Sequence, residues 1–212
     1  MKVPTALLSL FALAALAAGS SAEAAQKPGA GGMSGMTMSG AAKNASGVPV
    51  VHGLKPVSQM PGMPMVMPMM PIGTATWQGM KIQARVSGPT TFILLESGRQ
   101  MLVKPTARDR FHLMVMLTDA KSGTPIPYSS VWATITKGAQ GGGKPVFDER
   151  LWPMISETMG VHYGINVPLP AGGMYHLSLL ISPPAAARHM EYDNRWLTAH
   201  RVGFTFDYEP GA

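Results

Sequence analysis

Residues 110–118 alternate between two kinds of side chain over their whole length. One set is strongly apolar and the other is mixed: Phe111, Leu113, Val115 and Leu117 alternate with His112, Met114 and Met116. Successive side chains of a strand point to opposite faces of a sheet, so a period of two is typical of a half-buried β-strand. We therefore expect a strand whose apolar row faces a core and whose histidine and methionines share the other face. Apart from metal binding, this second row could decorate an outer face of the sheet or fill a second hydrophobic layer.

Similar short patterns recur along the rest of the chain. Further strands are expected at residues 80–86, 92–96, 101–104, 128–137, 161–167, 174–182 and 201–208. Glycine- and proline-rich turns separate them, and no segment has the periodicity of an amphipathic helix beyond one helical turn expected at residues 185–190. Several short strands with regular turns predict an all-β fold, a β-sandwich.

The first residues have the pattern of a secretory signal peptide. A lysine in the first four residues is followed by an apolar run at 6–18 and by the small-residue motif Ala22-Glu-Ala. This order of a basic, an apolar and a cleavable region predicts export, with cleavage near Ala24. We expect a periplasmic protein whose residues 1–24 are removed.

Residues 25–72 are rich in methionine, proline and glycine and have no strand or helix periodicity. Such a segment buries too little apolar surface to offset the entropy of ordering it, so we expect a flexible tail before a domain at 73–212. Its second half carries Met60, Met63, Met65, Met67, Met69 and Met70. These thioethers could capture copper(I), or they could form a linker or a pliable hydrophobic contact surface.

Composition excludes several classes of site. The chain has no cysteine, so disulfides, thiolate–zinc clusters and blue-copper centres are excluded, and any soft metal ligand must come from its 18 methionines. The net charge is +6, but only 13% of residues are charged and the basic residues are scattered. This distribution predicts a solvated basic surface and no nucleic-acid binding.

Residues 152–164 place a thioether, Met154, and an imidazole, His162, on either side of a short connection. Imidazole suits copper, zinc, iron and nickel, whereas a thioether favours copper(I). Ordinary packing of Met154 and an ordinary polar role for His162 explain the spacing equally well. His112 adds a third candidate on its strand, and His189 adds a fourth in the loop after Ser182-Pro-Pro.

Several of these motifs together resemble one known family. They are Trp152-Pro-Met, Val161-His-Tyr-Gly-Ile-Asn-Val, Gly172-Gly-Met-Tyr-His-Leu, Ile181-Ser-Pro-Pro with His189, and the closing Phe204-Thr-Phe-Asp-Tyr. The chain resembles the bacterial periplasmic iron-transport family over residues 110–208 and more weakly over 74–110. The resemblance implies an immunoglobulin-like domain that binds copper, forms a homodimer with metal near the interface, and works beside an inner-membrane iron permease.

The same resemblance implies the metal ligands His112, Met154, His162 and His189. The chain departs from the family pattern at Met114, where the family has a carboxylate, and in the loop before His162, where Glu157 is the only acid. Met114, Met116 and Glu157 are therefore auxiliary candidates. Oxygen ligands suit iron and thioethers suit copper(I), so the change favours copper over iron as the bound metal.

The main hypothesis is a periplasmic copper-binding protein that assists uptake or handling of iron or copper with a membrane transporter. One alternative is a copper(I) chaperone or resistance protein. Another is an immunoglobulin-like interaction module that binds no metal and uses its strand edges for protein contacts. An enzyme is not expected, because the sequence has no histidine-rich multicopper pattern and no Ser/His/Asp arrangement.

Overall fold

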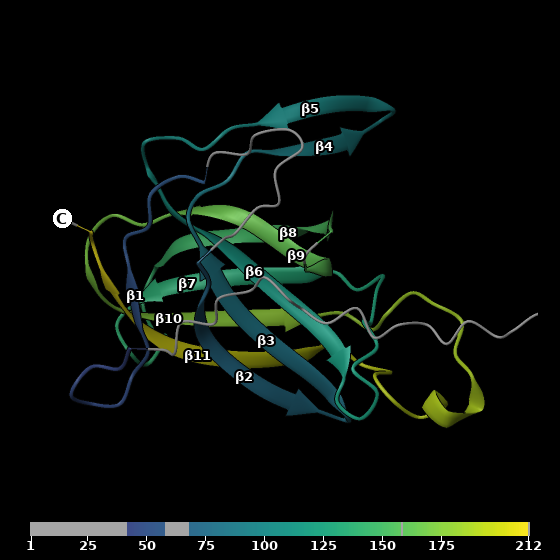
Figure 1. The fold of residues 1–212 in the computed structure, drawn as a ribbon. Coiled ribbons are helices and arrows are strands. Elements are labelled where there is room, and N and C mark those ends of the chain that lie inside the picture. The colour runs from purple at the N-terminus through teal and green to yellow at the C-terminus, as the bar shows by residue number, and fades with distance from the viewer. Residues whose placement is uncertain (1–41, 58–67, 158, 212) are drawn as a thin grey trace, which may run out of the picture. The chain divides into compact units, whose positions relative to one another are not determined.

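The computed structural model describes residues 42–57, 68–157 and 159–211. Within these ranges the chain forms strands and one 3-10 turn, η1 (Met190–Tyr192). The strands are β1 (Val50–His52), β2 (Met70–Trp77), β3 (Met80–Ser87), β4 (Phe92–Glu96), β5 (Arg99–Val103), β6 (Asp109–Asp119), β7 (Val131–Lys137), β8 (Pro145–Ser156), β9 (Gly160–Pro168), β10 (Gly173–Ile181) and β11 (His200–Glu209). The predicted all-β fold is confirmed (Figure 1). None of the helical residues described here makes a segment long and apolar enough to cross a membrane.

Nine of these strands form one continuous sheet in the order β1-β11-β10-β7-β8-β9-β6-β3-β2. Strand β8 joins its two halves, because residues 145–151 pair with β7 whereas residues 152–156 pair with β9. The halves face each other across the core, where Phe111 of β6 meets Phe206 and Tyr208 of β11 at ring-centroid distances of 6.0 and 6.2 Å. The predicted sandwich therefore consists of two layers that share β8, and the contact of β2 with β11 nearly closes it into a barrel.

The apolar row of β6 lies in the core as expected, with Phe111, Leu113, Val115 and Leu117 buried. The opposite row is buried as well, which agrees with the alternative of a second hydrophobic layer and not with a half-buried strand: His112 is 1% exposed, Met114 is 0% exposed and Met116 is 9% exposed. Met69, Val57 and Met159 pack over this outer face around Met114. Strand β6 is therefore covered on both faces, and its histidine is removed from water.

The folded part extends further toward the N-terminus than the boundary expected at residue 73. Strand β1 pairs in parallel with β11, and its Val50 and Val51 are buried, as is Met69 just before β2. Composition alone suggested a flexible tail here, but pairing with a distant strand orders these residues. The signal peptide and Met60, Met63, Met65 and Met67 lie outside the described residues.

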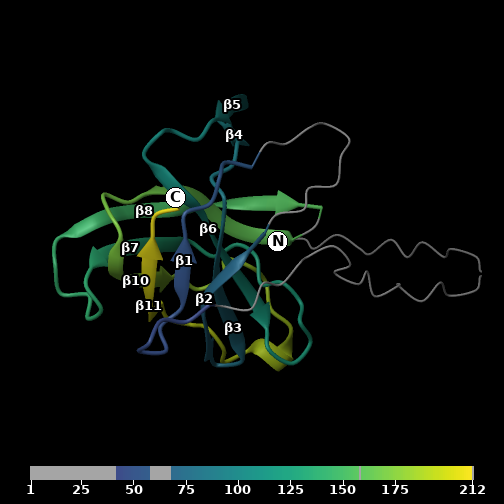
Figure 2. The same cartoon turned by 60° about the vertical axis from the view of Figure 1, so that its left-hand side comes forward.

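Two further features of the fold are the long strand β8 and the small β4–β5 sheet. The sequence predicted no strand at β8, whereas the structure extends it over Pro145–Ser156. Strands β4 and β5 form a separate two-stranded sheet that projects from the main one (Figures 1 and 2). This projection brings Phe92 of β4 against His112, with ring centroids 5.8 Å apart.

Candidate metal centre

Three of the four predicted ligands lie on one face of the sheet. Met154 of β8 is directly opposite His162 of β9, and His112 of β6 is directly opposite Asn166 of β9. Directly opposed residues of an antiparallel pair share a face, as do residues two apart in one strand. The connection between Met154 and His162 is thus a tight hairpin, and its two strands present the thioether and the imidazole side by side.

The ring of His112 is held by Asn166, which the sequence did not single out. Nδ1 of His112 lies 2.9 Å from Oδ1 of Asn166. The amide of Asn166 is oriented by Thr90, since its Oδ1 accepts from the Thr90 N–H at 3.1 Å and its Nδ2 donates to the Thr90 carbonyl at 2.8 Å. Because Oδ1 can only accept, Nδ1 of His112 carries the proton and Nε2 keeps the lone pair that a metal requires.

His162 is arranged in the same way. It is 3% exposed, and its Nδ1 lies 3.2 Å from the carbonyl oxygen of Gly160. A carbonyl oxygen only accepts, so this contact also leaves Nε2 as the unprotonated nitrogen. Both imidazoles therefore present Nε2 as their ligand atom.

Gly164 makes room for the ring of His112. A Cβ placed on Gly164 would lie 2.6 Å from Nε2 of His112 and 3.1 Å from the carbonyl oxygen of Leu113. Gly164 stands between Asn166 and His162 on the same face of β9, so the ring leans along β9 toward His162. A glycine within a strand often marks such a close approach. Gly164, inside the strand expected at residues 161–167, could therefore have indicated this packing from the sequence.

Burial keeps both histidines neutral. The pKa of His112 is lowered to about 4, chiefly by desolvation; the hydrogen bond to Asn166 raises it and the charge of His162 lowers it. Desolvation also lowers the pKa of His162, against the opposing effect of the Gly160 carbonyl. Neutral imidazole is the form that binds metals, so near neutral pH neither ring has to lose a proton before binding.

The groups around these side chains are thioethers and neutral polar groups together with Arg85, and Lys81 follows further along β3 on the same face. Met114 lies directly between Arg85 of β3 and Gly164 of β9, and Met116 follows on the same side of β6. No carboxylate stands directly opposite, or two residues along the strand from, His112, Met114, Met154 or His162, and Glu157 is exposed in the hairpin turn. Among the described residues, no three His, Cys, Asp or Glu side chains form a metal-binding group, and the soft donors that lie beside the two imidazoles on this face are thioethers.

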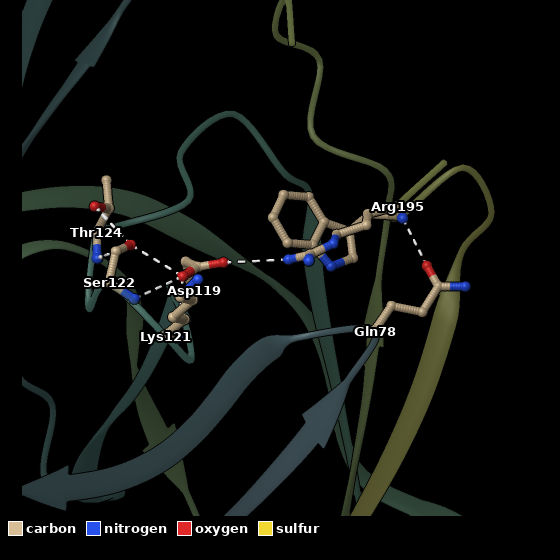
Figure 3. A network of polar contacts seen from close by, with 7 residues as sticks. Gln78, Asp119, Lys121, Ser122, Thr124 and Arg195 are labelled. Atoms are coloured by element: carbon tan, nitrogen blue, oxygen red, sulfur yellow. Dashed lines mark hydrogen bonds and ion pairs between the residues drawn. The ribbon is translucent and has the colours of Figure 1, made fainter. Parts of the chain in front are cut away.

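Two predicted ligands lie elsewhere. His189 is exposed and precedes η1 in the loop 182–199, outside the sheet. Two contacts hold that loop in place (Figure 3). Arg195 contacts Asp119, the last residue of β6, at 3.5 Å, and the Trp196 N–H donates at 2.6 Å to Gln78 in the turn between β2 and β3. Met70, an auxiliary candidate, packs against the main core, whereas its neighbour Met69 packs with Met114 on the outer face.

The fold and this face together define a β-sandwich with a candidate soft-metal centre of imidazoles and thioethers. The chain belongs to the Fe2+ transport protein family (Iron_transport), whose sequence model matches residues 70–210. This confirms the family resemblance seen in the motifs.

Two solved structures share the fold. One is FetP of uropathogenic Escherichia coli strain F11, as isolated after expression in the periplasm of E. coli, with 24% identity, a TM-score of 0.52, and coverage of 66% of this chain and 96% of FetP. The other is a copper-bound variant of the same FetP, with 23% identity, a TM-score of 0.52, and coverage of 66% and 92%. No curated protein matches the chain.

Proposed function

We propose that this chain is a periplasmic copper-binding member of the Fe2+ transport protein family and assists metal uptake with a membrane transporter. The observation that carries the proposal is the arrangement of His112 and His162, two buried imidazoles on one face whose Nδ1 atoms both face oxygen acceptors. Both Nε2 atoms are thereby free for a metal, and the thioether of Met154 lies directly opposite His162.

Copper fits this donor set better than iron does. Two neutral imidazoles serve copper in either oxidation state, a thioether adds affinity for copper(I), and no carboxylate of the kind that iron prefers stands next to them in the strand register. A bound copper ion would supply a centre that can exchange one electron between copper(I) and copper(II). His189 is the proposed fourth ligand, from the loop 182–199 that lies outside the sheet.

The family name and the FetP structures support the wider role. FetP was expressed in the periplasm and one variant of it was copper-bound, and the signal-like N-terminus of this chain agrees with such a location. An inner-membrane permease as partner, a homodimer, and copper(I) capture by the methionines at 60–70 belong to the same proposal.

Metal titration of the mature protein tests the copper assignment. We expect about one copper(II) per chain and a higher melting temperature on loading, because a ligand that binds only the native state stabilises it. His162→Ala and Met154→Leu should weaken binding, whereas His52→Ala, which removes an exposed histidine on β1, should not. An unchanged melting temperature with copper, or tight Fe2+ binding without copper binding, would overturn the assignment.

A further inference from the structure

A second group of thioethers lies on the same outer face of the sheet. Met69 and Met114 form a small buried cluster apart from the main core, and Val57 and Met159 pack against it. Three of these four side chains are methionines, whereas the buried members of the main core, among the described residues, include only one, Met80. Methionine is therefore concentrated where the sheet has its histidines.

The three methionines come from segments that are distant in the sequence. Met69 directly precedes β2, Met114 is in the middle of β6, and Met159 is in the turn between β8 and β9. The fold brings them together beside the imidazoles, since Met114 is two residues from His112 on one strand and Met159 is three residues before His162. The cluster therefore borders the proposed copper ligands from the side on which the N-terminal segment reaches the sheet.

The surroundings suit a soft monovalent ion. Met114 is 0% exposed and Met69 is 3% exposed, so water is excluded from these two side chains, and Met159 packs against them half-buried. Thioethers are neutral soft ligands that select copper(I), whereas a divalent ion would lack the oxygen or imidazole ligands that it prefers. Methionine is more flexible than leucine and defines a packing arrangement less well. Packing alone would therefore favour leucine at these buried positions.

We propose that Met69, Met114 and Met159 form a thioether-only copper(I) site, from which copper passes to the adjacent ligands His112, Met154 and His162. The transfer of copper to His112, Met154 and His162 rests on the proposed function, whereas the binding of copper(I) by the three thioethers does not. Transfer exchanges thioether ligands for imidazole and thioether ligands on the same ion, with no change in oxidation state.

An anaerobic copper(I) titration against the chromophoric competitor bicinchoninate tests the site in the mature chain. Met69→Leu/Met114→Leu/Met159→Leu should lose one copper(I) equivalent or bind it at least tenfold more weakly. Met69→Leu/Met159→Leu, which leaves Met114 in place, should weaken copper(I) binding and keep copper(II) binding. Met80→Leu, a fully buried methionine of the main core, is the matched control and should behave like the wild type. The other methionines are present in both proteins, so the difference between them reports the cluster.

Methyl NMR of the wild type, labelled with 13C at the methionine ε-methyl groups, covers the case in which the triple variant does not fold. The resonances of Met69, Met114 and Met159, assigned from single leucine variants, should shift with the first equivalents of copper(I), and that of Met80 should not. Unshifted cluster resonances, or a folded triple variant with wild-type copper(I) binding, would overturn the site. His162→Ala separates the two proposals, because it should lose copper(II) and keep the cluster shifts.

Discussion

The Nε2 atom of His112 lies 2.6 Å from the position that a Cβ would occupy on Gly164. The imidazole of β6 thus fills space that β9 leaves open by carrying no side chain. The neighbouring Asn166 fixes the other end of the same ring. Strand β9 therefore carries one candidate ligand, His162, and its Gly164 and Asn166 position the other candidate, His112.

Gly164→Ala is expected to displace the ring of His112 and to destabilise the fold. The ring cannot move freely, because Asn166 holds its Nδ1, and the new methyl group would also crowd the carbonyl oxygen of Leu113. Overpacking of this kind costs about 1–3 kcal/mol, and copper should bind more weakly. Urea denaturation and copper titration measure both effects. Gly142→Ala is the control, since no atom lies near its Cβ position; equal denaturation midpoints for the two variants would contradict the close approach.

Asn166→Ala is expected to weaken copper binding by roughly 10- to 100-fold, the usual effect of removing the partner of a metal-binding histidine. Without Oδ1, the ring of His112 is free to change its tautomer and orientation. Competition titrations measure the affinity. Asn166→Asp keeps an acceptor for Nδ1 and should restore more of the affinity than Asn166→Ala does. Equal loss in both variants would mean that Asn166 acts through packing and not through the histidine.

Local patterns predicted β6 and the face that His112, Met114 and Met116 share, because period-two alternation depends only on neighbours in the sequence. The support of His112 could not be predicted in this way, since Thr90 and Asn166 are 76 residues apart and meet only through the fold. Strand β8 was missed because Asp148, Glu149 and Arg150 interrupt its apolar pattern. Pairing with β7 and β9 on its two sides orders it instead.

The burial of both faces of β6 could not be predicted from its own sequence for a similar reason. Sequence alternation distinguishes the two rows of β6 but does not show what covers the second row. Its cover includes Met69 and Val57, from a segment whose composition is typical of a flexible tail. A mixed row of histidine and methionine therefore looks half-exposed in the sequence and proves to be enclosed in the structure.

The stability of the metal-free protein should decrease as the pH falls from about 6.5 to 4. The folded-state pKa of His112 is about 4, below its ordinary value of 6.5, because burial disfavours the charged ring. In this window the unfolded chain binds the proton and the native state does not, so protonation favours unfolding; above 6.5 the contribution is complete. The difference of pKa corresponds to about 3 kcal/mol from His112.

Urea denaturation between pH 4 and 8, in the presence of a chelator, measures this slope. His112→Gln should make it shallower, because glutamine does not titrate and His162, whose pKa is also lowered by burial, then contributes alone. His52→Ala, which removes a histidine whose side chain is 51% exposed, should leave it unchanged. A wild-type stability that is constant across the window would show that His112 is not held in its neutral form by burial.

Copper loading should slow hydrogen exchange in residues 185–192 if His189 joins the site. His189 lies in a loop fastened through Arg195 to Asp119 at one end of β6, whereas the other ligands lie within the sheet. If His189 of the same chain binds, the loop is drawn toward β8 and β9, and the ordering cost makes His189 a weaker contributor than His162. We expect His189→Ala to keep one copper per chain, to bind it about tenfold more weakly, and to abolish the protection seen by hydrogen–deuterium exchange.

His162→Ala should lose far more affinity, because its ring is already in place. Wild-type affinity and unchanged exchange in His189→Ala would limit the site to His112, Met154 and His162.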